Sequence, residues 1–119
     1  MDKISIIIPC FNEEDALPIY YDEMKKVMDI MKKQSDFELI FVDDGSSDRT
    51  YEIMKELHRK DGRCQYLSFL REIFGKNEAA IYAGLQNAGG NYAAIMDVDL
   101  QDPPSLLPEI VPDIEGRSV

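Results

Sequence analysis

The most informative stretch of this sequence is FELIFVDDGSSD, residues 37–48, in which an apolar run leads directly into an acidic turn. Its first half, residues 37–42, is short and apolar, which predicts a buried strand. Ser47 or Asp48 can cap a following helix, because a side-chain oxygen there accepts a hydrogen bond from the first free backbone N–H groups. We expect that helix over residues 49–60.

The alternation of strand and helix continues on both sides of this stretch. The predicted strands are residues 4–8, 37–42, 65–70 and 92–96, and the predicted helices are residues 16–33, 49–60, 77–87 and a last segment opened by Pro103-Pro104. Pro9 is expected to stop the first strand. Strands that alternate with helices at this spacing predict an α/β fold with a mostly parallel sheet, helices on both faces and right-handed crossovers.

Length and composition fit one domain. The chain has 119 residues, of which 45% are apolar, and its formal net charge is −10. That charge argues against a nucleic-acid partner, because phosphate contacts need clustered Lys and Arg. Cys10 and Cys64 form neither a metal spacing nor a disulfide framework, so we expect two buried thiols. No apolar stretch approaches the roughly 18 residues of a membrane span.

Acidic residues follow the predicted strand 92–96 at the sheet edge where α/β proteins bind ligands. The carboxylates of Asp97 and Asp99 can converge on a hard cation such as Mg²⁺ or Mn²⁺, and Gln101 offers a further neutral oxygen. The alternative is a turn in which Asp99 or Asp102 caps the next helix. We predict a metal site at Asp97 and Asp99, and a helix cap at Asp102.

Two further strand ends carry candidate binding residues. Asp43 or Asp44 could accept hydrogen bonds from a nucleobase or a ribose, since a carboxylate is an acceptor only. The alternative, a turn with acids favoured by the helix dipole, is preferred for residues 46–48 but not for the aspartate pair. After the first strand, Phe11 could lie against a flat base and Glu13 could bond a ribose or base donor.

Other readings of the first and third strand ends remain open. Taken alone, the first segment favours Asn12 as a helix cap, with acids in the first helical turn. After the third strand, Arg71 or Lys76 could contact a diphosphate, Arg through a fork and Lys as a point charge. The alternative for both is a solvated loop charge.

Taken together, these motifs resemble family 2 glycosyltransferases, and most of all the polyprenyl-phosphate group with dolichol-phosphate mannose synthases and bactoprenol glucosyltransferases. The resemblance is carried by IIIPCFNEE at residues 6–14, FVDDGSSD at 41–48, FGK at 74–76 with EAAIYAGL at 78–85, and MDVDLQDPP at 96–104. The segments follow the family's order over almost the whole chain. The resemblance implies the Rossmann-like GT-A nucleotide-diphospho-sugar transferase fold.

The resemblance also implies which residues hold the nucleotide of a UDP- or GDP-linked sugar. They are Pro9, Phe11, Glu13 and one or both of Asp43 and Asp44.

The same resemblance assigns the diphosphate end of the donor. Asp97, Asp99 and Gln101 would hold Mg²⁺ or Mn²⁺ against the diphosphate, so that Asp99 and Gln101 take part in catalysis. Lys76 matches the basic position of the family's Arg-Asn-Phe-Gly-Lys-Glu segment. This chain carries one extra residue on each side of Phe-Gly-Lys, which would re-aim Arg71, so Lys76 is the preferred cation.

The implied reaction is inverting: a polyprenyl phosphate attacks the anomeric carbon, and an ionised phosphate needs no strong base. Family members continue into an acceptor-binding half, and this group usually ends in transmembrane helices. Residues 1–119 are therefore expected to be the N-terminal donor-binding part, which alone binds donor and metal but transfers sugar poorly or not at all. We expect the parent protein to be anchored in the inner or plasma membrane, with its site on the cytoplasmic side.

The alternatives are a family 2 transferase that uses a polysaccharide acceptor and a catalytically silent nucleotide-binding module. A response-regulator receiver needs its acidic pair after the first strand, where this chain has Pro9-Cys10-Phe11. A dinucleotide-binding dehydrogenase needs a Gly-rich turn there, which Asn12-Glu13-Glu14 does not supply.

Overall fold

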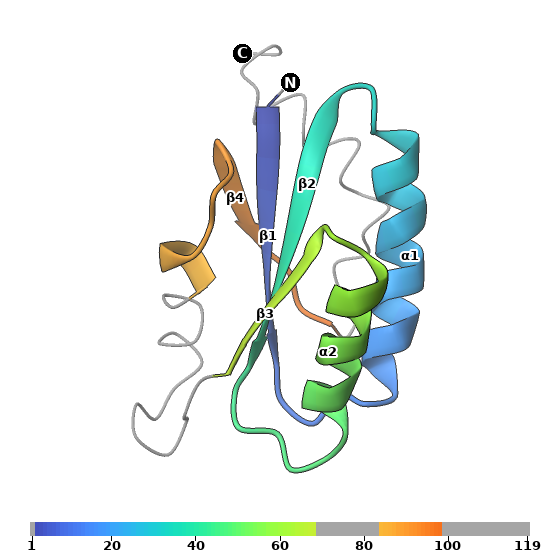
Figure 1. The fold of residues 1–119 in the computed structure, drawn as a ribbon, viewed down its shortest axis with the longest axis vertical. Coiled ribbons are helices and arrows are strands. Elements are labelled where there is room, and N and C mark those ends of the chain that lie inside the picture. Colours follow the sequence, from blue (N-terminus) through green and yellow to red (C-terminus); the bar gives the residue numbers. More distant parts are fainter. Residues whose placement is uncertain (1, 69–83, 99–119) are drawn as a thin grey trace.

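A computed structural model of the chain describes residues 2–68 and 84–98 (Figure 1). Within these residues the strands form one sheet in the order β3-β2-β1-β4, and every strand pair is parallel. The elements are β1 (Asp2–Cys10), α1 (Ala16–Ile30), β2 (Ser35–Asp43), α2 (Thr50–Lys60), β3 (Cys64–Ser68) and β4 (Tyr92–Ile95). The predicted α/β fold with a parallel sheet is confirmed.

The main core lies between the sheet and the two helices α1 and α2, which cover the same face (Figure 1). Successive strand residues point to opposite faces, so Ile4, Ile6 and Ile8 of β1 all enter this core and are fully buried. Apolar residues of α1 recur at helical spacing and meet them. They are Leu17, Tyr20, Tyr21, Met24, Val27 and Met28. Each such burial contributes about 1.5–3 kcal/mol.

The opposite face of the sheet carries a smaller cluster of Ile7, Ile40 and Val42. Residues 84–86 are helical and lie on this side (Figure 1). Gly84 allows the close approach, because a Cβ there would lie 2.6 Å from Cγ2 of Ile7. Helices on both faces are thus confirmed, although residues 77–83 of the predicted third helix lie outside the described residues.

The first strand and the first helix end differently from the prediction. β1 does not stop before Pro9: it continues to Cys10, with Pro9 opposite Val42 of β2. The helix α1 ends at Ile30 instead of residue 33, and residues 31–34 form a turn. The turn is needed because the parallel register places Ser35 opposite Asp2, so that the chain has to cross back to the start of β1.

None of the helices within the described ranges combines the length and the apolar character needed to cross a membrane.

Candidate nucleotide-binding site

The carboxyl ends of β1, β2 and β4 lie at one edge of the sheet, because the three strands are parallel. The chain moves outward from β1 to β2 and β3 and then returns to the other side of β1 as β4. The change of direction puts the topological switch point between β1 and β4. Open α/β sheets bind ligands at such a point, outside the carboxyl ends of the strands.

Pro9 separates β4 from β1 at this edge. The carbonyl of Ile7 accepts a hydrogen bond from the N–H of Met96 at 3.0 Å, so the backbone groups of Ile7 face β4. Pro9 lies two residues further on and faces the same side, but proline has no N–H to donate. The β1–β4 pairing ends at Ile7 and Ile95, whereas on the other side the carbonyl of Cys10 still accepts from Asp44 N–H at 2.8 Å. β4 is therefore free to leave β1 just before Asp97.

Asp43 and Asp44 are both buried at the end of β2, with relative exposures of 5% and 2%. A carboxylate oxygen of Asp43 accepts the backbone N–H of Ser46 at 3.1 Å. The turn between them passes through Gly45 at φ 81°, a left-handed conformation that favours glycine. The turn predicted for this segment is present, and it holds Asp43 in a defined position.

The buried thiol of Cys10 reports the electrostatic field at this edge. Burial raises the pKa of Cys10 well above its usual value, and the nearby charges of Glu13 and Asp43 raise it further. Glu13 comes from the loop between β1 and α1, and Asp43 is the last residue of β2, so two separate segments place a carboxylate near the same thiol. Cys10 and Cys64 are both free and buried, as predicted from the sequence.

Asn12 joins the two loops that carry the candidate nucleotide ligands, which lie side by side in Figure 1. Its side-chain oxygen accepts the backbone N–H groups of Ser47 at 2.8 Å and Asp48 at 3.3 Å. Its own N–H donates to Oγ of Ser46 at 2.9 Å. The prediction that Asn12 caps the first helix is wrong, because α1 has Asp15 at its N-cap and the amide of Asn12 is used across the loops.

A second set of hydrogen bonds strengthens this connection. Glu13 N–H donates to Oγ1 of Thr50 at 2.7 Å, and Glu14 N–H donates to Asp48 at 3.2 Å. In return, the carboxylate of Glu14 accepts Arg49 N–H at 3.3 Å. Asp48 also accepts Thr50 N–H at 2.9 Å, but the prediction that Ser47 or Asp48 is the N-cap of α2 is wrong, because the N-cap is Arg49 and it makes no side-chain cap hydrogen bond. Burial alone would raise the pKa of Asp48, but the hydrogen bonds from Thr50 and Glu14 hold it below its usual value.

Phe11 and Asp97 are presented to solvent at this edge. The ring of Phe11 is 43% exposed, and Asp97 is exposed between the buried Met96 and Val98. The hydroxyl of Tyr20 contacts the Met96 sulfur at 3.6 Å. Apolar packing on both sides therefore fixes the backbone from which the Asp97 carboxylate projects.

The predicted metal site lies partly outside the described residues. Asp97 is within them, whereas Asp99, Gln101, Lys76 and Arg71 are not. Residues 2–68 and 84–98 contain no group of three or more His, Cys, Asp or Glu side chains placed to hold a metal ion. The exposed carboxylate of Asp97 is a hard oxygen donor of the kind that Mg²⁺ and Mn²⁺ prefer. The chemistry of this one ligand is therefore compatible with the predicted metal site.

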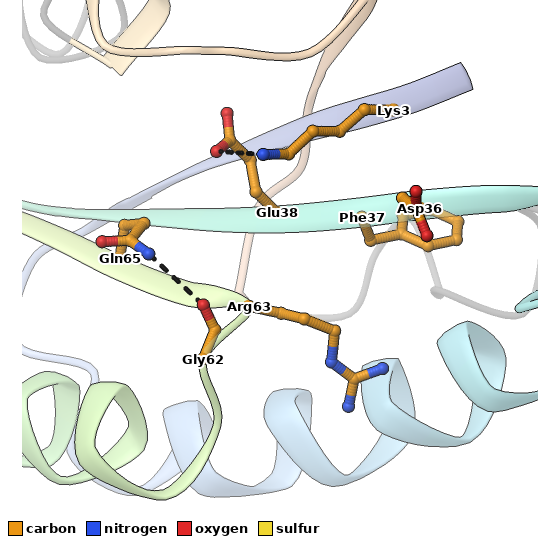
Figure 2. Close-up of a pocket in the computed structure, with 7 residues that line it drawn as sticks. All are labelled: Lys3, Asp36, Phe37, Glu38, Gly62, Arg63 and Gln65. Atoms are coloured by element: carbon orange, nitrogen blue, oxygen red, sulfur yellow. Dashed lines mark hydrogen bonds and ion pairs between the residues drawn. The ribbon is translucent and has the colours of Figure 1, made fainter. Parts of the chain in front are cut away.

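A hollow of about 340 Å³ lies at the other end of the sheet, where β2 and β3 begin (Figure 2). Lys3 and Arg63 are among the residues that line it, but each is in an ion pair, Lys3 with Glu38 at 3.4 Å and Arg63 with Asp61 at 2.8 Å. None of the predicted site residues lines this hollow.

A parallel α/β sheet with a topological switch point is typical of proteins that bind nucleotides at the carboxyl ends of the strands. The chain belongs to glycosyl transferase family 2, whose sequence profile matches residues 5–118.

Relatives of known name support the same assignment. The bactoprenol glucosyl transferase of Shigella phage SfV is 40% identical over 109 residues, which cover 92% of this chain and 34% of that protein. This chain therefore spans about a third of the length of the relative.

Solved structures share the fold. TarS 1–349 of S. aureus matches with a TM-score of 0.74 and 24% identity over 96% of this chain and 32% of that one; TarS has also been solved with UDP. The mannosyltransferase PcManGT from Pyrobaculum calidifontis, in complex with GDP-Man and Mn²⁺, matches with a TM-score of 0.63 and 22% identity over 82% of this chain and 28% of that one. The expected GT-A fold is confirmed.

Proposed function

We propose that this chain is the donor-binding part of an inverting, metal-dependent glycosyltransferase that moves a sugar from a nucleoside diphosphate to a polyprenyl phosphate. The observation that carries the proposal is the end of the β1–β4 pairing at the switch point. There Pro9 ends the β1–β4 ladder, with the Asp43-Asp44 turn on one side and Asp97 on the other. Membership of glycosyl transferase family 2 and a solved neighbour with GDP-Man and Mn²⁺ support it.

The nucleoside is assigned to the carboxyl ends of β1 and β2. Phe11 offers an exposed ring on which a flat base can stack. Glu13 and the buried pair Asp43 and Asp44 supply acceptors for base N–H or ribose hydroxyl groups. A buried acceptor discriminates strongly, because a ligand that lacks the matching donor leaves the acceptor without its hydrogen bond.

The diphosphate is assigned to the β4 end. Asp97, with Asp99 and Gln101, would hold Mg²⁺ or Mn²⁺, and Lys76 would contact the phosphates. When bound, the cation accepts negative charge from the departing nucleoside diphosphate. Asp97 and its neighbours would fix the diphosphate so that the anomeric carbon is presented to the acceptor.

The acceptor assignment rests on the bactoprenol glucosyl transferase relative. An oxygen of the lipid phosphate forms the new bond to the anomeric carbon, the bond to the nucleoside diphosphate breaks on the opposite side, and the configuration inverts. The attacking phosphate is already ionised, so the step has no proton to remove. We further propose that the parent protein is held at the membrane, with this domain on the cytoplasmic side.

The first test is isothermal titration of the full-length protein with UDP and GDP, with and without Mn²⁺. One nucleotide should bind in the presence of the metal, and Asp97→Asn should weaken binding at least tenfold. Asp36→Asn is the matched control, because it removes the same charge from the opposite end of the sheet and should leave affinity unchanged. Equal loss of affinity in both variants, or no binding of either nucleotide, would contradict the proposal.

The second test supplies UDP-glucose, UDP-N-acetylglucosamine or GDP-mannose with undecaprenyl phosphate in detergent and measures glycolipid formation. Transfer to a polysaccharide but not to the lipid phosphate would favour the other family 2 acceptor class. Metal-dependent binding without transfer to either acceptor would identify a silent nucleotide-binding module. Residues 1–119 should bind but transfer poorly, and robust transfer by them would refute the expected division into donor and acceptor parts.

A further inference from the structure

The two loops that carry the proposed nucleoside ligands have little regular structure of their own. Phe11 and Glu13 lie on the loop between β1 and α1, and Asp43 and Asp44 lie where β2 enters the next loop. The relative position of the loops therefore depends on the hydrogen bonds between them. Asn12 makes the central ones, through both its side chain and its backbone.

Asn12 suits this task in its backbone conformation. Its φ is 53°, in the left-handed region, and among the described non-glycine residues no other has a positive φ. Asn enters this region more readily than most residues, which lets the chain turn sharply after Phe11. The turn aims the amide oxygen of Asn12 at the N–H groups of Ser47 and Asp48, 2.8 and 3.3 Å away.

Asn12 also suits the task because its amide is neutral. The loops it joins both carry acids, Glu13 and Glu14 on one and Asp43 and Asp48 on the other, and nearby like charges repel. Burial raises the pKa of Cys10, and the negative charges of Glu13 and Asp43 raise it further. An amide oxygen accepts the same hydrogen bonds as a carboxylate without adding another negative charge.

We propose that Asn12 is a positioning residue for nucleotide binding: it holds the Phe11–Glu13 loop against the Asp43–Asp48 loop, so that both halves of the nucleoside site are preformed. The inference rests on the proposed function. In this arrangement Asn12 touches the neighbouring loop and not the nucleotide. Its loss lowers the fraction of molecules with both loops in place, and the apparent affinity falls by the same factor.

The test compares Asn12→Gly with Asn12→Asp in the full-length protein. Glycine accepts the positive φ but removes the amide oxygen, whereas aspartate keeps an acceptor in the same place. Hydrogen exchange reports directly on the Ser47 and Asp48 amides, and titration with UDP and GDP in the presence of Mn²⁺ reports on the site. Both are measured at about 0.5 M salt to screen the added charge of the aspartate.

We expect the Ser47 and Asp48 amides to exchange faster in Asn12→Gly and nucleotide affinity to fall about tenfold. Asn12→Asp should restore both to within about threefold of the wild type. Kinetically, the glycine variant should raise KM and leave kcat nearly unchanged, because the reacting end of the donor is held by other residues.

Three results would overturn the inference. Unchanged exchange at Ser47 and Asp48 in Asn12→Gly would show that Asn12 does not hold the loop. Faster exchange with unchanged affinity would show that the loop contact has no part in binding. Equal loss of affinity in the glycine and aspartate variants would show that the Asn12 amide contacts the nucleotide itself. Failure of the proposed function is distinguishable, because the wild type would then bind neither nucleotide while its Ser47 amide stayed protected.

Discussion

Replacing Gly90 with alanine should destabilise the protein, because the chain passes very close to β1 just before it enters β4. A Cβ at Gly90 would lie 2.7 Å from the carbonyl oxygen of Lys3, 2.7 Å from Oγ of Ser5 and 2.9 Å from the Ser5 nitrogen. All three separations are shorter than the 3.0 Å below which real Cβ contacts are essentially never found. Two of the three atoms are backbone, so rotation of a side chain cannot relieve the overlap.

The size of the expected loss in stability depends on which segment has to move to make room for the Cβ. β1 is paired on both sides, with β2 and with β4, so the 89–91 segment has to retreat instead. That segment is held by hydrogen bonds from Gly90 N–H to Ser5 Oγ at 2.9 Å and from Asn91 N–H to the Lys3 carbonyl at 2.7 Å. Overpacking costs about 1–3 kcal/mol and weakening one hydrogen bond about 1 kcal/mol, so we expect a loss of about 2–4 kcal/mol.

The assay is urea unfolding followed by far-UV circular dichroism, since the chain has no tryptophan. Gly62→Ala is the matched control, because a Cβ at Gly62 meets nothing within 4 Å. Its free energy of unfolding should change by less than about 1 kcal/mol, in the stabilising direction if at all. Unfolding of Gly90→Ala at the same urea concentration as Gly62→Ala would refute the close approach.

Three further substitutions test the nucleotide site and two side-chain contacts of the fold. Phe11→Ala should weaken nucleotide binding about tenfold or more by loss of base stacking, whereas Ile19→Ala, at a site 55% exposed on α1, should not. Burial opposes ionisation of Glu38, but its hydrogen bonds hold its pKa below the ordinary value of 4.5, so it stabilises the fold above that pH. In acid unfolding, Glu38→Gln should therefore be less stable than the wild type near neutral pH, and the difference should shrink as the pH falls below about 4.5. Tyr21→Phe should lower the free energy of unfolding by about 1 kcal/mol, because it removes the 2.8 Å hydrogen bond to Asp61.

The order of strands and helices could be predicted because it depends on local patterns. A run such as residues 37–42 lies in a parallel sheet covered on both faces, and all of its residues except Glu38 are apolar and buried for that reason. Helical spacing over α1 likewise gives its buried face directly. The end of α1 could not be predicted, because it depends on the register that places Ser35 opposite Asp2, and register is a contact between distant residues.

The candidate site also has some features that follow from local sequence patterns and others that depend on contacts between distant residues. The positions of Asp43 and Asp97 at strand ends follow from the sequence, because parallel strands bring their carboxyl ends to one edge. The cross-loop role of Asn12 does not, since its partners lie more than thirty residues away and any polar loop residue could have been one of them. The one usable signal was an asparagine two residues after the end of a strand, because Asn enters the left-handed region more readily than most residues. Asp99, Gln101 and Lys76 stay predictions.

The two ends of the sheet differ in how their negative side chains are compensated by hydrogen-bond donors and cations. At the amino end, the half-buried carboxylate of Glu38 accepts hydrogen bonds from Ser5 Oγ at 2.6 Å and from Gly89 N–H at 2.6 Å, and it pairs with Lys3 at 3.4 Å. These donors lower its pKa even though burial opposes ionisation. The fold therefore compensates this charge internally, and the same contacts fix the start of β4.

At the carboxyl end, burial raises the pKa of the Cys10 thiol, and the negative field of Glu13 and Asp43 raises it further. A free nucleoside diphosphate is itself negative, so an edge with this field repels it. A divalent cation held by Asp97 and its neighbours would reverse the sign of the interaction. Nucleotide binding should consequently depend on the metal more steeply than on any single nucleoside contact. A nucleotide that bound equally well after chelation of divalent ions would show that the field at this edge is compensated in another way.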